Sequence, residues 1–124
     1  MVGPLRHWVI GDVHGCHASL LALLAVLPCQ DHLVFCGDVV SRDGHIEASM
    51  HLVWDLVGCG RATWLRGNHE QALIDALTEC GKGSQPALNR QWAHRLNQLP
   101  LLYCADGWCA THAGFNSAGE PDLS

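Results

Sequence analysis

Four short segments concentrate the side chains in this chain that could do chemistry. They read GDVHG at residues 11–15, GDVVSR at 37–42, RGNHE at 66–70 and THAG at 111–114. Asp12 and His14 are two positions apart, so on an extended segment their side chains lie on the same side and can bind one ion. Asp38 has two carboxylate oxygens and can bridge two ions. The residue types therefore indicate a metal centre.

The remaining donors complete the same kind of site. Asn68 offers a neutral carbonyl oxygen and His112 an imidazole, and no thiolate is included, which suits Mn, Fe, Zn or Mg. Two such ions about 3.5–4 Å apart can clamp a phosphoryl group and activate water. His69 could donate a proton to a leaving oxygen, and the planar guanidinium of Arg42 could hold phosphate oxygens.

Each motif is weak by itself, because Asp-x-His and Asn-His-Glu arise by chance and a single histidine is more often structural. The prediction depends on four glycine-flanked segments in order, each placed at the end of an expected strand. The other six of the nine histidines are expected to be ordinary surface or core residues: His7, His17, His32, His45, His51 and His94. The five tryptophans are expected to pack in the core.

The elements that must position these segments follow a simple alternation. Short β-rich apolar runs at 7–10, 32–36 and 62–65 alternate with helical patterns at 19–27 and 46–57. This βαβαβ order predicts a parallel sheet whose strand ends meet at one edge, where ligands bind in α/β proteins. The helix at 19–27 is apolar nearly all round and is expected to be mostly buried.

Two further helices and a hairpin should follow. Residues 70–80 and 86–99 show helical spacing of apolar side chains. Short strands at 101–104 and 108–111 flank Asp106-Gly107, a hairpin signal. The fourth candidate segment then follows the second hairpin strand.

Composition narrows the class of protein. The chain has 124 residues, enough for one domain, with 48% hydrophobic residues and a formal net charge of −5. An acidic chain argues against a nucleic-acid polymer as partner. The seven cysteines form no C-x-x-C pair, so buried reduced thiols in a cytoplasmic protein are expected. With no signal core and no membrane-length apolar run, no membrane partner is expected.

The four segments resemble the signature blocks of the calcineurin-like metallophosphoesterases over residues 7–115. Within that family the chain is most similar to bacterial and phage serine/threonine phosphatases, followed by symmetrical diadenosine tetraphosphate hydrolases. The resemblance implies two divalent ions, usually Mn, with Fe, Zn or Mg as other choices. It assigns these ions to Asp12, His14, Asp38, Asn68 and His112.

The resemblance also implies roles in catalysis. His69 would be the general acid and Asp38 the bridging carboxylate, while Arg42 and Asn68 would bind phosphate. The activity implied is hydrolysis of a phosphorylated protein or a small phosphoester by a metal-activated water. The implied fold is α/β, a β-sandwich flanked by helices, with residues 1–124 forming its N-terminal half: a βαβαβ unit, two helices and a β-hairpin. Residues 1–124 are thus expected to be a catalytic domain incomplete at its C-terminus, and a homodimer is left open.

Two departures from the family pattern keep alternatives open. Ser41 replaces the aspartate that usually orients the general acid, with Asp43 at the usual glycine, which predicts a weaker acid at His69. The later metal-binding histidine and phosphate-binding arginine are missing. Ser41 supports the bis(5'-nucleosyl)-tetraphosphatase (symmetrical) alternative. The missing histidine supports a catalytically inactive metal-binding fragment that needs the missing half or a partner.

Overall fold

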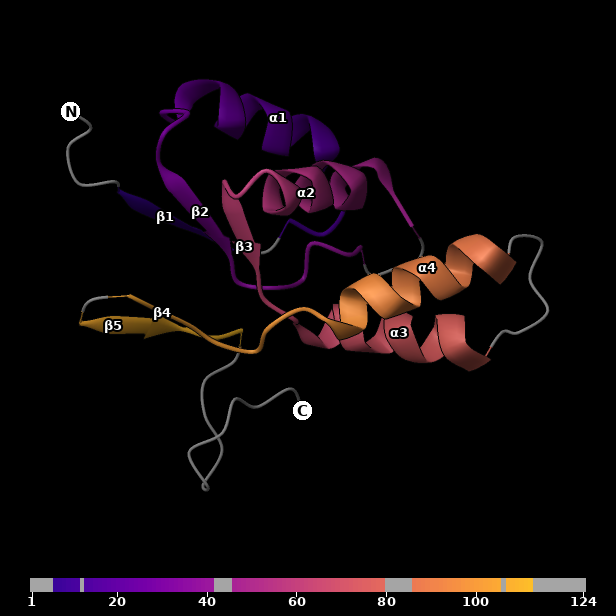
Figure 1. Cartoon of the computed structure of the whole chain (residues 1–124). Helices are drawn as coiled ribbons and strands as arrows, with labels where there is room; N and C mark the ends of the chain where they lie inside the picture. The colour runs from indigo at the N-terminus through magenta and orange to yellow at the C-terminus, as the bar shows by residue number, and fades with distance from the viewer. Residues whose placement is uncertain (1–5, 12, 42–45, 80–85, 106, 113–124) are drawn as a thin grey trace.

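The computed structural model describes residues 6–11, 13–41, 46–79, 86–105 and 107–112. Its elements follow the predicted order (Figure 1): β1 (His7–Ile10), α1 (His17–Val26), β2 (His32–Phe35), α2 (Ala48–Gly58), β3 (Ala62–Trp64), α3 (Asn68–Glu79), α4 (Pro86–Asn97), β4 (Tyr103–Ala105) and β5 (Trp108–Ala110). Strands β1, β2 and β3 form a parallel sheet in that order, and β4 pairs antiparallel with β5. The predicted α/β fold is confirmed.

The central strand β2 separates two packing layers, because its side chains alternate between the two faces of the sheet. Leu33 and Phe35 are fully buried in the main apolar cluster, which includes Met50 and Val53 of α2. Val34 points the other way and joins Ala110 of β5 in a smaller cluster. The helices α1 and α2 thus cover one face of the sheet, and the hairpin β4–β5 lies on the other (Figure 1).

Helices α3 and α4 pack against each other beside this sheet and extend the main cluster with Leu73, Trp92 and Leu96. Trp64 and Trp92 are almost completely buried, which confirms their predicted packing role, whereas Trp8 is 37% exposed. Helix α3 begins at Asn68 rather than at the predicted residue 70. Two of the candidate chemical residues, Asn68 and His69, therefore lie in its first turn.

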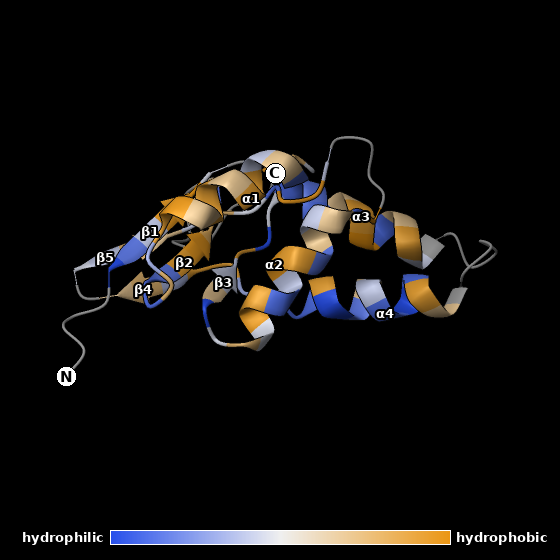
Figure 2. Ribbon diagram, turned by 90° about the horizontal axis from the view of Figure 1, so that it is seen from above, coloured by the Kyte–Doolittle hydropathy of each residue, from blue (hydrophilic) through white to orange (hydrophobic). Residues whose placement is uncertain are grey.

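The expectation that the first helix is mostly buried is wrong. Only Leu20 of α1 is buried in the described structure, and Val26 is 76% exposed. A helix against a sheet covers it with one side, so an all-apolar helix leaves an apolar outer side. Figure 2 shows this hydrophobic colouring along most of α1. Across the described residues, no helix has the length and apolar character needed to span a membrane.

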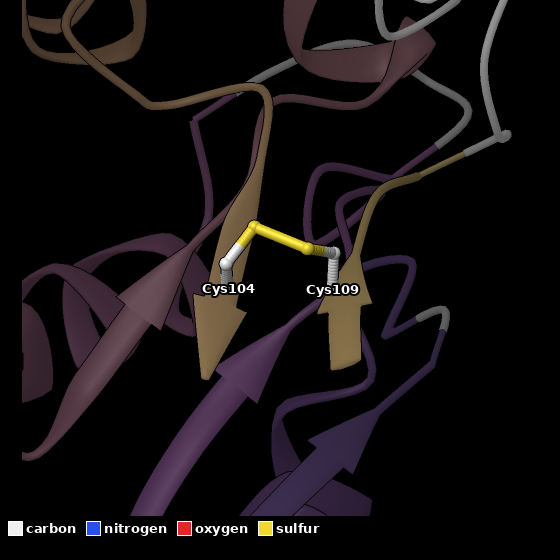
Figure 3. The surroundings of a disulfide bond; sticks show 2 residues. All are labelled: Cys104 and Cys109. Atoms are coloured by element: carbon white, nitrogen blue, oxygen red, sulfur yellow. A yellow bond between two sulfur atoms is a disulfide. The ribbon is translucent and has the colours of Figure 1, made fainter. Parts of the chain in front are cut away.

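The cysteine expectation is also wrong in part. Cys104 and Cys109 are directly opposite each other in the β4–β5 register and form a disulfide bond (Figure 3). Cys16, Cys29 and Cys59 carry free thiols, as predicted, but are exposed rather than buried. The C-x-x-C criterion does not detect this pair, although the hairpin predicted around 106–107 places residues 104 and 109 opposite each other.

The loop after β2 must approach the loop after β3 very closely. Gly37 has φ +98°, and a Cβ there would lie 2.8 Å from backbone atoms of Gly67 and 2.9 Å from His112 Nδ1. Gly60 has a similar φ of +82°, yet a Cβ there would meet nothing within 4 Å. Substitutions at Gly37 and Gly60 therefore separate the free-energy cost of a positive φ from the cost of a close contact at the added Cβ.

We predict that Gly60→Ala lowers the free energy of unfolding by about 1 kcal/mol through backbone strain alone. Gly37→Ala should cost about 3 kcal/mol or more, because the overpacking penalty adds to the strain. Urea denaturation of both variants measures the difference. Equal losses would show that the close approach of the two loops contributes nothing.

Candidate metal centre

The loops that follow β1 and β2 are joined through their backbones. The N–H of His14 donates to the carbonyl of Asp38 at 2.8 Å, and the N–H of Gly15 donates to the carbonyl of Val39 at 2.9 Å. His14 and Asp38 both adopt left-handed backbone conformations, with φ of +47° and +55°. Such strain in non-glycine residues persists only where surrounding contacts enforce it, and it is concentrated at functional sites.

This backbone arrangement brings three predicted side chains together. One ligand atom each from His14, Asp38 and His69 lie within 4.8 Å of one another. The His14 and His69 rings have centroids 4.9 Å apart. Asp38 is 6% exposed, and its Oδ1 accepts a 3.1 Å hydrogen bond from the backbone N–H of His69. The carboxylate is therefore fixed relative to the first turn of α3.

A second group shares Asp38 and is completed from the hairpin. His112 follows β5, and its Nδ1 lies 2.9 Å from the carbonyl oxygen of Cys36. A carbonyl can only accept, so in the neutral imidazole this contact places the hydrogen on Nδ1 and leaves the lone pair on Nε2. That Nε2 lies 3.4 Å from Asp38 Oδ2 and 2.9 Å from the side-chain amide of Asn68.

The contacts around Asn68 test whether this group suits a cation. Its carbonyl oxygen lies 2.9 Å from His112 Nε2 and 3.0 and 3.1 Å from the two Asp38 oxygens. Acceptors that face one another repel unless the amide turns over to donate its hydrogens or a cation lies among them. Neighbouring ligands of an octahedral ion with bonds of about 2.1 Å are about 3.0 Å apart. The donor set therefore fits a hard divalent ion.

Glu70 joins the loops that carry these donors, although its side chain lies outside both groups. Its buried carboxyl accepts hydrogen bonds from the backbone N–H groups of Asp38 at 2.6 Å, Val40 at 3.0 Å and Gly67 at 2.8 Å. Burial raises the pKa of Glu70, while the three N–H donors oppose the rise and the Asp38 carboxylate adds to it. The side chain thus fixes the loop after β2 to the start of α3.

The role of Glu70 is not predicted from the sequence, although the position of this glutamate in its helix indicates one of its contacts. A glutamate at the third position of a helix often reaches back to the N–H of the N-cap residue, which here is Gly67. The spacing predicts that contact alone. The other two donors are some 30 positions away and become neighbours only in the folded chain.

Several predicted site residues are not tested by these contacts. Asp12, Arg42 and Asp43 lie outside the described residues. Ser41 is described, and its buried Oγ makes no hydrogen bond there. His69 Nδ1 instead lies 3.4 Å from the carbonyl oxygen of Val40. Within the described residues, Ser41 therefore does not orient His69 by a hydrogen bond.

Comparisons with known proteins show what the whole chain is similar to. A family profile described as "Calcineurin-like phosphoesterase" matches residues 5–121. The symmetrical bis(5'-nucleosyl)-tetraphosphatase of Xylella fastidiosa (strain 9a5c) is 37% identical over 125 residues, which cover 86% of this chain and 41% of that protein. Serine/threonine-protein phosphatase 1 of Salmonella typhimurium is 40% identical over 78 residues, or 57% of this chain and 33% of that protein.

Solved structures show the same fold. A protein serine/threonine phosphatase from Saccharomyces cerevisiae superposes with a TM-score of 0.70 at 22% identity, covering 91% of this chain and 39% of that one. At this identity the likeness concerns the fold alone. The chain spans about two fifths of the length of the curated tetraphosphatase it matches.

We predict that Glu70→Gln lowers the free energy of unfolding by about 2 kcal/mol, because an NH₂ group replaces one of two buried acceptor oxygens. Asp75→Asn, on the exposed side of the same helix, is the matched control and should change stability by less than about 0.5 kcal/mol.

The raised pKa of Glu70 also predicts how the free energy of unfolding depends on pH. The native state holds the Glu70 proton more tightly than the unfolded chain does. The stabilisation by Glu70 is therefore complete below the ordinary carboxyl pKa and declines as pH rises through the raised value. The advantage over Glu70→Gln should therefore shrink from acid to neutral pH; an advantage that grows would contradict this assignment.

Proposed function

Because this chain belongs to the calcineurin-like phosphoesterase family, we propose that it is a metal-dependent hydrolase of phosphoester bonds. The observation that supports this proposal most is the convergence of Asp38, Asn68 and His112, whose polar side-chain atoms lie 2.9–3.4 Å from one another. A divalent cation among these atoms satisfies them, as does an Asn68 amide turned over to donate its hydrogens.

The proposed centre holds two divalent ions, most simply Mn. Asp38 belongs to both groups of donors, the one with His14 and His69 and the one with Asn68 and His112, as a bridging carboxylate must. Asp12 would add an oxygen ligand beside His14. Ions bound there would supply polarisation of the phosphoryl group and activation of water.

The chain's own residues would orient the substrate and move the proton. The lone pair of His112 Nε2 is directed at the centre because Nδ1 is engaged by Cys36. His69 would donate a proton to the leaving oxygen, with its Nδ1 facing the Val40 carbonyl and its Nε2 carrying the mobile proton. Arg42 and the Asn68 amide would bind phosphate oxygens.

We propose a serine/threonine phosphoprotein as the substrate class, on the resemblance of the Asn-His-Glu-Gln segment and of Leu99-Pro100-Leu101 to that branch. A dinucleoside tetraphosphate is the second candidate. It is favoured by the tetraphosphatase relative, whose match covers 86% of this chain, and by Ser41 in place of the usual aspartate.

The two substrate classes can be separated by direct comparison. We expect Mn-dependent release of inorganic phosphate from a phosphothreonine peptide to exceed cleavage of diadenosine tetraphosphate by at least tenfold in kcat/KM. Both reactions are followed with the same purified chain. A ratio in the opposite direction would assign the chain to the tetraphosphatase branch.

The metal centre itself is tested by pairing two substitutions. Asp38→Asn should abolish Mn binding in calorimetry together with Mn-dependent hydrolysis of p-nitrophenyl phosphate, because it removes the carboxylate shared by both groups. His69→Asn should retain Mn binding and lower kcat by about a hundredfold or more, as expected for loss of a general acid.

His94→Asn is the matched control, because His94 is exposed on α4 and bonds only to Gln98 in the described structure. It should leave both readouts unchanged. If His69→Asn loses Mn binding as completely as Asp38→Asn does, His69 is a ligand and not the acid. Wild-type activity in both site variants would refute the proposed centre.

A further inference from the structure

We propose that Cys104 and Cys109 are a reversible thiol–disulfide pair that controls how firmly His112 is held in the metal centre. The inference rests on the proposed function for the assignment of His112 as a ligand. It adds a covalent modification site that lies outside the centre and acts on it through the hairpin.

The pair is placed for exchange with solvent. Cys104 and Cys109 are cross-strand partners with Cα atoms 4.1 Å apart, and both residues are exposed (Figure 3). Reaction with a small thiol or disulfide requires such access. Strand alternation directs these two side chains to one face of the hairpin and their neighbours to the other.

The opposite face of the hairpin holds it to the main sheet. The Tyr103 hydroxyl and His7 Nε2 share a hydrogen bond of 3.0 Å, and the Trp108 ring packs edge-on against His7 with centroids 5.4 Å apart. Ala110 is buried against Val34 and Leu65. The disulfide therefore lies on the side that the described residues leave uncovered, where it joins the strands without taking part in these contacts.

The route from the disulfide to the centre is short. Ala110 and Thr111 are the two residues that separate Cys109 from His112. The hairpin has three paired residues on each strand, and a two-stranded hairpin of this size is marginal by itself. A covalent link between its strands restricts the separated conformations. Opening the link allows β5 to move and with it His112.

The chemistry balances with a small-molecule disulfide such as oxidised glutathione. One cysteine thiolate attacks a sulfur of that disulfide, forming a mixed disulfide and releasing one thiol. The second cysteine thiolate then attacks the protein sulfur of the mixed disulfide and releases the other thiol. The protein loses two electrons and two protons, and the small disulfide gains them as two thiols.

The test measures Mn²⁺ binding to the wild-type chain after equilibration in oxidised or reduced glutathione, with the glutathione then removed without air. If the reduced hairpin holds His112 in place a tenth to a third of the time, the apparent affinity falls roughly three- to tenfold on reduction. Amide hydrogen exchange over residues 103–112 should accelerate in the same sample.

Two double variants isolate the pair. Cys104→Ser/Cys109→Ser should bind Mn²⁺ with the affinity of the reduced wild type in both buffers. Cys29→Ser/Cys59→Ser removes two exposed free thiols and should keep the full redox response. Because reduction of the wild type requires no substitution, the result does not depend on the folding of a variant.

Equal, measurable Mn²⁺ affinity in the oxidised and reduced wild type would overturn the inference and leave the proposed function standing. Absence of Mn²⁺ binding in both states would refute the proposed function and the inference together. Retention of the redox response by Cys104→Ser/Cys109→Ser would also overturn the inference, because another thiol would then be responsible.

Discussion

The candidate site depends on the carboxyl group of Glu70, which accepts the backbone N–H groups of Asp38, Val40 and Gly67. An unpaired buried N–H group is costly, so a single side chain that satisfies three of them fixes the course of two loops at once. The left-handed backbone of Asp38 is maintained by these bonds and by the close approach of Gly37 to Gly67. The position of the Asp38 carboxylate follows from this constraint.

From that carboxylate the site extends across two layers of the fold. His14 comes from the loop after β1, and His69 comes from the first turn of α3, which follows β3 of the parallel sheet. His112 comes from the end of the hairpin, which packs on the opposite face of the same sheet. Because its donors come from both the parallel sheet and the hairpin, the geometry of the centre depends on the contacts between these two layers. The Val34–Leu65–Ala110 cluster and the Tyr103–His7 contact therefore bear on metal binding, although none of these residues reaches the centre.

The sequence predicts the order of elements because each strand is a short β-rich apolar run followed by a glycine-rich segment of polar side chains. The same pattern predicts that Asp38 and Asn68 meet, because the ends of parallel strands lie at one edge. His112 follows a strand of the antiparallel hairpin and reaches them because that hairpin packs on the sheet. The pattern could not predict Glu70's contacts with Asp38 and Val40, since these partners lie some 30 positions away and become neighbours only in the folded chain. The exposure of Val26 could not be predicted from the sequence either, because the hydropathy of a helix does not say which of its sides other elements cover.

The central claim is that Asp38, Asn68 and His112 surround a divalent ion. It is tested most directly by anomalous diffraction at the manganese edge from crystals of the chain grown with Mn²⁺. The account predicts an anomalous peak within about 2.3 Å of an Asp38 oxygen, the Asn68 carbonyl oxygen and His112 Nε2. A fully ordered site without such a peak, with the Asn68 amide donating its hydrogens to Asp38 and His112, would contradict it.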